Sequence, residues 1–240
     1  MREITLVFVA FILLFGACRF AGGKRITGNN QVTTENRQIN GFTGIEVAGP
    51  FKVYLTQGND FSVRIEAEEN LMDYIITKKD GDVLEIKTKR NYRIRSHKDM
   101  KLYISAPQYR ELRIAGSGGI WSQNKISNAS EIEISIAGSG DVVADIDAPR
   151  INAEIAGSGS TILKGTTRDM NAEIAGSGDI RAFDLLSENT KVEIAGSGNV
   201  QVFASKQLDV SIAGSGDVAY KGGAQVKQSK AGSGTVKKAD

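Results

Sequence analysis

Apolar and polar residues alternate along most of the second half of the chain, and each alternating run ends in the same four residues, Ala-Gly-Ser-Gly. The residue directly before this motif is isoleucine in six of the seven copies, and most residues two and four positions earlier are also apolar. A period of two is typical of a β-strand that buries one face. The isoleucines expected to point inward are Ile114, Ile136, Ile155, Ile174, Ile194 and Ile212, and Lys230 takes their place in the last copy.

The motif recurs with a nearly constant period. Its copies begin at Ala115, Ala137, Ala156, Ala175, Ala195, Ala213 and Ala231, at intervals of 22, 19, 19, 20, 18 and 18 residues. Repeats of this length predict a solenoid, in which each unit buries its apolar face only by stacking on its neighbours. Glycine reaches positive φ without a Cβ clash, so the motif predicts a sharp corner between two strands.

We therefore predict an all-β fold, a right-handed parallel β-helix with about 18–22 residues per coil and Ala-Gly-Ser-Gly corners. The spacing does not fit a leucine-rich repeat, and heptads are absent. Residues 114–240 form the motif-bearing part. Residues 36–113 contain less regular strands and turns, which we interpret as N-terminal β coils continuous with the repeats. A helical turn is expected near Leu71, and a hairpin or coil turn at 79–82.

The start of the chain has the pattern of an export signal. Residues 1–17 combine a basic start, an apolar run too short to span a bilayer and small residues near the end, which predicts a signal peptide. Cys18 is the only cysteine, and its setting resembles a bacterial lipobox, so we expect lipidation there. An ordinary cleaved signal with an incidental cysteine is the alternative. Residues 18–35 have little apolar periodicity and read as a lipid tether and linker.

Composition excludes several classes of protein. The formal net charge is +2 and no long run of basic residues suggests nucleic-acid binding. The basic segment 87–98 is interpreted as a solvated loop or protected edge strand, with a sugar- or anion-binding patch as the alternative. A single cysteine leaves no intrachain disulfide, so stability must come from stacked apolar strands.

The first half of the chain also carries a family resemblance. The run Arg37–Gly49, the run Val53–Gly58 and the run Ile65–Leu71, followed by the train of motifs, resemble the bacterial family described as putative auto-transporter adhesin, head GIN domain. The resemblance covers about residues 37–236. It implies a β-helical envelope protein, often a lipoprotein, with a supposed adhesive role. It implies no established catalytic residues.

The residues themselves offer little chemistry. His97 is the only histidine and nothing in the sequence pairs it with a nucleophile, so a Ser-His-acid triad is not expected. Phosphate-loop, dinucleotide and zinc motifs are missing, and we expect no catalytic residue, no metal and no cofactor. The motif serines are expected to be structural corner residues in a hydroxyl ladder, and they are Ser117, Ser139, Ser158, Ser177, Ser197, Ser215 and Ser233.

Two sets of residues are candidates for ligand binding. Glu154, Glu173 and Glu193 should stack on successive coils, and Asp141, Asp179 and Asp217 should form a second acidic column interrupted by Ser160 and Asn199; a cation could favour such columns. Among the aromatic residues of the repeats, burial is favoured for Phe183 and Phe203. Trp121 lies in the widest interval between motifs, and we expect a ligand there first.

These patterns favour an exported, lipid-anchored adhesin-like or envelope binding module, an outer-membrane lipoprotein that binds a polysaccharide or a surface protein without catalysis. The first alternative is a polysaccharide lyase or pectinase-like enzyme, because such enzymes share the scaffold. A structural or sensory envelope component is the second. Membrane attachment is expected through the lipid alone.

Overall fold

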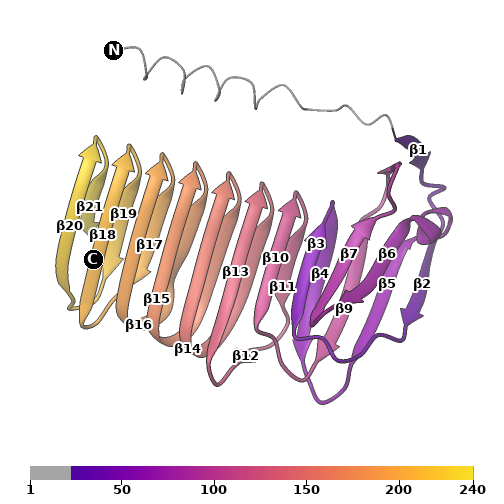
Figure 1. Cartoon of the computed structure of the whole chain (residues 1–240), viewed down its shortest axis with the longest axis horizontal. Helices are drawn as coiled ribbons and strands as arrows, with labels where there is room; N and C mark the ends of the chain where they lie inside the picture. Colours follow the sequence, from indigo (N-terminus) through magenta and orange to yellow (C-terminus); the bar gives the residue numbers. More distant parts are fainter. Residues whose placement is uncertain (1–22, 240) are drawn as a thin grey trace, which may run out of the picture.

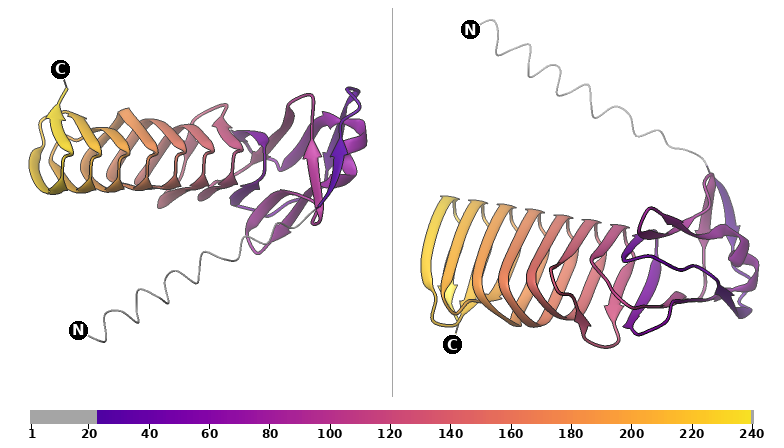
Figure 2. Two further views of the ribbon diagram at one scale, coloured as in Figure 1. Left: turned by 90° about the horizontal axis from the view of Figure 1, so that it is seen from above. Right: turned by 60° about the horizontal axis from the view of Figure 1, so that its bottom comes forward.

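A computed structural model describes residues 23–239 and shows a rod built from two ladders of parallel strands (Figures 1 and 2). The predicted β-solenoid is confirmed. Residues 1–17 and Cys18, with the predicted signal peptide and lipid site, lie outside the described residues. Each coil contributes one strand to each ladder, so the coil is flattened and has two faces.

The first ladder contains the strands that run into the motifs, and their ends lie along the upper edge of the rod in Figure 1. In spatial order they are β7 (Val83–Thr88), β3 (Gly44–Ala48), β10 (Glu111–Gly116), β13 (Glu131–Gly138), the second halves of β14 (Asp141–Gly157), β15 (Ser160–Gly176) and β16 (Asp179–Gly196), then β18 (Gln207–Gly214) and β20 (Gln225–Gly232).

The second ladder contains the strands that follow the motifs. They are β9 (Met100–Ala106), β4 (Phe51–Gln57), β11 (Gly119–Ser122), the first halves of β14, β15 and β16, then β17 (Asn199–Phe203), β19 (Asp217–Lys221) and β21 (Thr235–Lys238). The short β12 (Ile126–Ser127) pairs with β14 at the far edge. In the three central coils one long strand bends from the second ladder into the first.

The core follows the predicted alternation. The six isoleucines that precede the motifs are at most 2% exposed, and each stacks in register on the next. Full burial of one such side chain contributes roughly 1.5–3 kcal/mol. Lys230 occupies the same register opposite Ile212 but is exposed. The core is therefore one continuous apolar column between the two ladders.

Main-chain geometry explains the glycines of the motif. Gly176 has φ +134°, and a Cβ built there would lie 2.3 Å from the carbonyl oxygen of Gly157 in the coil below. The amide of Ser177 donates to that same oxygen at 2.9 Å. A side chain on the first glycine would therefore enter the hydrogen bond that joins successive corners.

Antiparallel strands cover the N-terminal end of the rod. β5 (Ser62–Glu68) pairs with β9, β2 (Val32–Arg37) pairs with β5, and β6 (Ile75–Asp80) forms a hairpin with β7. The 3-10 helix η2 (Glu69–Tyr74) joins β5 to β6. The helical turn and the hairpin are confirmed. We call this set of elements, β2, β5, η2 and β6, the N-terminal cap.

Part of the segment expected to be a tether forms strands. β1 (Lys24–Thr27) pairs in parallel with β8 (Tyr92–Arg95), and β2 also begins before residue 36. The five residues from Val32 to Asn36 are exposed. A strand that lies on the outside of a cap without an inward apolar face shows no alternation, which is why the pattern did not predict it.

The chain does not enter the rod at its end. The coil formed by β3 and β4 lies between the coil of β7 and β9 and the coil of β10 and β11. Both of its neighbours come later in the sequence. From β10 onward, each coil stacks directly on the one that precedes it in the chain.

Candidate functional site

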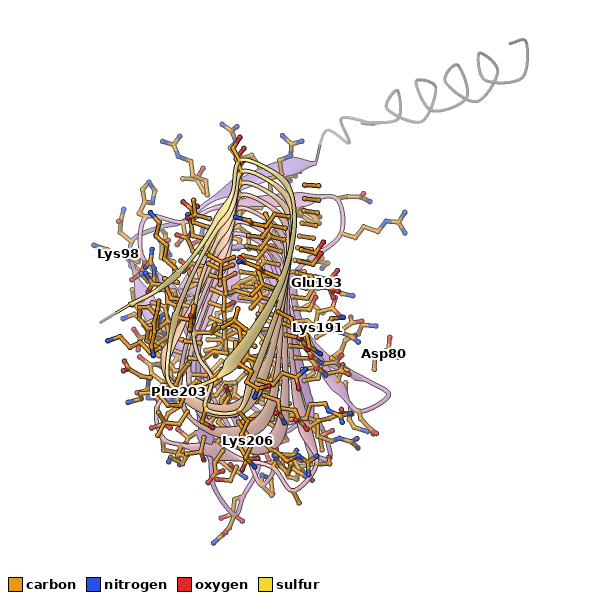
Figure 3. The ribbon with its side chains drawn as sticks, turned by 90° about the vertical axis from the view of Figure 1, so that its left-hand side faces the viewer. Asp80, Lys98, Lys191, Glu193, Phe203 and Lys206 are labelled. Carbon is orange, nitrogen blue, oxygen red and sulfur yellow. The ribbon has the colours of Figure 1, made fainter. Side chains whose placement is uncertain are left out.

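The predicted ligand-binding residues lie on opposite faces of the flattened rod. Glu154, Glu173 and Glu193 point outward from the first ladder, whereas Trp121 belongs to the second ladder. Figure 3, viewed along the rod, shows Glu193 on one long side and Phe203, a second-ladder residue, on the other. Trp121 and the glutamates therefore cannot act in one site.

The glutamate column is in register, as its sequence spacing predicts. Glu154 is opposite Glu173, and Glu173 is opposite Glu193. The ammonium of Lys191 lies 2.8 Å from Glu193 Oε1, and this hydrogen bond raises the pKa of Lys191. Across residues 23–239, no group of three or more His, Cys, Asp or Glu side chains is arranged to hold a metal ion.

The aspartate column has a different organisation, because donors separate its acids. Asn199 Nδ2 donates to Asp179 Oδ1 at 3.0 Å. The hydroxyl of Thr235 donates to Asp217 at 2.6 Å, and together with the Thr235 amide at 2.9 Å it lowers the pKa of Asp217. Asn199 and Thr235 thus each link their own coil to the aspartate of the coil before it by a side-chain hydrogen bond.

Corner serines occupy exposed positions at the edge where the two ladders meet. The amide of Ser158 donates to Gly138 at 2.8 Å and that of Ser197 to Gly176 at 2.8 Å, and the other motifs from Ser139 onward repeat the contact. The links between successive corners that the structure describes run through the main chain. The hydroxyl ladder expected from the sequence stays a prediction.

Trp121 ends a stack of three aromatic rings on the second ladder. The ring centroids of Tyr54 and Tyr103 are 5.2 Å apart, and those of Tyr54 and Trp121 are 5.6 Å apart. The guanidinium of Arg64 covers Tyr103 at 4.3 Å. The indole of Trp121 lies over Gly119, where a Cβ would be 2.2 Å from its ring. Tyr54 has an aromatic ring on either side, so Trp121 is the end of the stack that faces the motif coils.

A groove follows directly along the rod. In the outward column, Trp121 is opposite Val143, which is followed in register by Ile162, Arg181 and Gln201. Val143, Ile162, Arg181 and Gln201 line a cavity of about 430 Å³, within the range of roughly 300–1,000 Å³ of small-molecule sites. Its walls include Gln123, Asn124, Asp145, Lys164, Phe183 and Asp184.

Phe183 corrects an expectation from the sequence. It is only half-buried and lines the groove, although its burial in the core was predicted. Alternation from the buried Ala182 directs Phe183 outward, and the pairing of β15 with β16 shifts between Ile162 and Lys164, so that Asp184 also lies outside the core. Phe203 is also half-buried, because regular alternation from the buried Val202 directs it outward. The prediction of core positions for both was wrong.

A β-solenoid with a lined groove on one face and an aromatic stack leading into it is a scaffold for binding. The family comparison agrees with the sequence resemblance. A family model described as putative auto-transporter adhesin, head GIN domain, matches residues 41–224. The chain belongs to this family.

Solved structures show the same fold. A putative adhesin from Bacteroides fragilis is 23% identical, with a TM-score of 0.84 over 89% of this chain and 100% of that one. A putative lipid binding protein from Parabacteroides distasonis is 28% identical, with a TM-score of 0.74 over 90% of this chain and 100% of that one. A putative adhesin from Parabacteroides merdae is 21% identical, with a TM-score of 0.72 over 90% and 100% of the two chains. None of the curated proteins matches the chain.

Within residues 23–239, the structure contains no helix long and apolar enough to cross a membrane.

Proposed function

We propose that the protein is an exported, lipid-anchored, adhesin-like module of the cell envelope that binds an extended partner, a polysaccharide or a surface protein, and carries out no catalysis. The observation that supports binding most directly is the outward column of the second ladder, where the aromatic stack continues into a groove over successive coils. Such a surface offers contacts along the rod. Family membership and the adhesin fold support the envelope role.

The geometry around the sole histidine supports a non-catalytic role. His97 Nδ1 lies 3.4 Å from Glu68 Oε1, and the His97 amide donates to the same carboxylate. Glu68 is fully buried at the end of β5, within the N-terminal cap. A general base must lie within hydrogen-bond reach of the group that it activates, and His97 has this contact only with a structural carboxylate among the described residues.

An adhesion assay with cells that display the protein tests the proposal. Cells that display the full-length protein should adhere to at least one surface in a panel coated with pectin, mannan, mucin or fibronectin, with adhesion several times above that of cells without it. Reducing-end assays on the same polysaccharides, with and without Ca²⁺, should detect no product. Adhesion to none of the surfaces would contradict a binding role, and turnover of any polymer would establish the enzymatic alternative instead.

Cys18 provides a separate prediction for the anchor. If its thiol carries the lipid, the wild-type protein incorporates an alkyne-tagged fatty acid and fractionates with membranes, since each buried methylene contributes about 0.8 kcal/mol. The Cys18→Ala variant should lose all of the label and move to the soluble or secreted fraction. A wild-type protein that takes up no label, or a variant that keeps it, would show that Cys18 is not the anchor.

A further inference from the structure

The groove lies where the repeat is broken. The widest interval between motifs contains a bend at Gln123 and Asn124 after β11, and the pairing shift between Ile162 and Lys164 interrupts the most regular part of the ladder. Both irregularities border the same cavity. Bulges of this kind are enriched beside functional sites, where they re-aim side chains. A rod otherwise made of near-identical coils thus has one face that is locally different.

The floor of the groove exposes apolar surface. Ile162 is 39% exposed and lies between Val143 and Arg181 in the outward column. Phe183 stands on one side, with the ammonium of Lys221 5.1 Å from its ring centroid. The other outward columns that we described are charged or polar. An apolar strip inside a polar rim fits the C–H face of a sugar ring, which also carries hydroxyls at its edge.

Asp145 supplies an unused acceptor in the wall. Its Oδ1 is buried and receives no hydrogen bond. The ammonium groups of Lys125 and Lys164 lie 3.8 Å from Oδ1 and 3.6 Å from Oδ2, which gives electrostatic compensation but no hydrogen bond. A carboxylate that lacks a hydrogen-bond donor is costly, and the Asp145 side chain is 26% exposed, so a ligand hydroxyl that donates to this carboxylate would be favoured.

The charges of the lining balance, which favours a neutral ligand. Two basic side chains, Lys164 and Arg181, and two acidic ones, Asp145 and Asp184, line the groove. Arg181 is itself paired with Asp179 at 3.0 Å. Gln123 and Gln201 add amide groups that can donate and accept. Asn124 is already committed, because its side chain pairs with the main chain of Gln57 at 2.8 and 2.9 Å and fixes the turn. The available polar groups are thus both donors and acceptors, as a set of hydroxyls requires.

We infer that this groove binds a short segment of a neutral oligosaccharide. Ile162 and Phe183 contact the sugar ring, and Asp145 accepts a hydrogen bond from a sugar hydroxyl. Gln123 and Gln201 bind neighbouring hydroxyls, and Trp121 borders the next position along the rod. The inference rests on the proposed binding function and gives it a ligand class and a location.

Titration of the full-length protein, purified in detergent, with cellohexaose, mannohexaose, chitohexaose and hexagalacturonate tests the inference. At least one of the three neutral sugars should bind, and Ile162→Thr and Asp145→Asn should each weaken that binding about tenfold or more, roughly 1.4 kcal/mol. Leu186→Thr is the matched control, because Leu186 is 51% exposed on the same long strand as Phe183 but outside the groove. It should change the affinity less than twofold.

Three results would overturn the inference: binding of none of the neutral sugars, binding of hexagalacturonate alone, or unchanged affinity in both groove variants. Circular dichroism of each variant separates lost binding from lost folding; Ile162 is exposed and Asp145 is half-buried. Adhesion of cells in the assay above together with any of these results would leave the proposed function standing and remove only the groove as its sugar site.

Discussion

Replacing Gly176 by alanine is expected to lower the free energy of unfolding by about 3 kcal/mol or more. The backbone at this corner has φ +134°, which L side chains rarely adopt, and the new Cβ would lie 2.3 Å from a carbonyl oxygen that cannot rotate away. The next corner rests on the same geometry, since the Ser197 amide donates to Gly176. Strain at one corner should therefore weaken the stacking of two coils. Urea unfolding followed by circular dichroism measures the change.

Ser177→Ala in the same motif is the control. Ser177 is exposed, and the hydrogen bond from its amide to Gly157 does not need the hydroxyl. We expect a change within about 0.5 kcal/mol, as for most surface substitutions. A Gly176→Ala variant as stable as this control would show that the corner tolerates a side chain and that the motif glycines are not required by the fold.

Replacing Glu68 by glutamine should remove about 2–3 kcal/mol of stability at pH 7. Its carboxylate is fully buried and accepts hydrogen bonds from the Asn30 amide at 2.7 Å, the His97 amide at 2.8 Å and the Ser96 hydroxyl at 2.5 Å. The main chain of Gly28 packs against it so closely that a Cβ would be 2.1 Å away. Glu68, at the end of β5, thus holds the turn before β2 and the segment after β8 against the cap, and an amide NH₂ would face donors.

The same contact makes stability dependent on acid. Burial by itself raises the pKa of Glu68, but the hydrogen bonds from Ser96, His97 and Asn30 outweigh it and lower the pKa from 4.5 to about 2. Because the folded pKa lies below the unfolded one, this contribution is fully present above about pH 5 and is lost as the pH falls toward 2. Urea unfolding and hydrogen exchange of β1 and β2 should show the wild type converging on Glu68→Gln over that interval.

Glu66→Gln is the matched control on the same strand. Glu66 is about 30% exposed and pairs with Lys101 at 3.2 Å, an arrangement that contributes roughly 0–1 kcal/mol. We expect a small change in the free energy of unfolding. Between pH 5 and 2 the stability of this variant should follow the same pH dependence as that of the wild type. Equal effects of the two substitutions would contradict the role of Glu68 as the residue that holds the cap together.

Much of the fold could be predicted because the residues that recur in each repeat determine the register in which successive coils pair. The isoleucine before each motif, the glycines within it and the polar residues between apolar positions recur with a period that only stacked coils satisfy. The alignment of Glu154, Glu173 and Glu193 followed from the same spacing and is observed. Local pattern was sufficient here because neighbouring coils are also neighbours in sequence.

The groove could not be predicted from the pattern, because it depends on departures from the repeat. Alternation from the buried Ala182 places Phe183 outside the core, and the shift after Ile162 leaves Asp184 outside beside it; a period of two carries no sign of that shift. The stack of Tyr103, Tyr54 and Trp121 depends on pairings between distant segments. Trp121 was expected near a ligand because of the wide interval between motifs. In the proposal, Trp121 borders the groove, so the expectation stays part of that proposal.

The position of the β3–β4 coil bears on the order in which the chain folds. During synthesis β3 and β4 emerge early, yet the strands that flank them, β7 and β9 on one side and β10 and β11 on the other, follow much later. Contacts between distant segments form slowly because loop closure must precede them. We expect nucleation among the motif coils or in the β6–β7 hairpin, with the N-terminal half joining last, so that an exported chain stays unfolded until most of it is available.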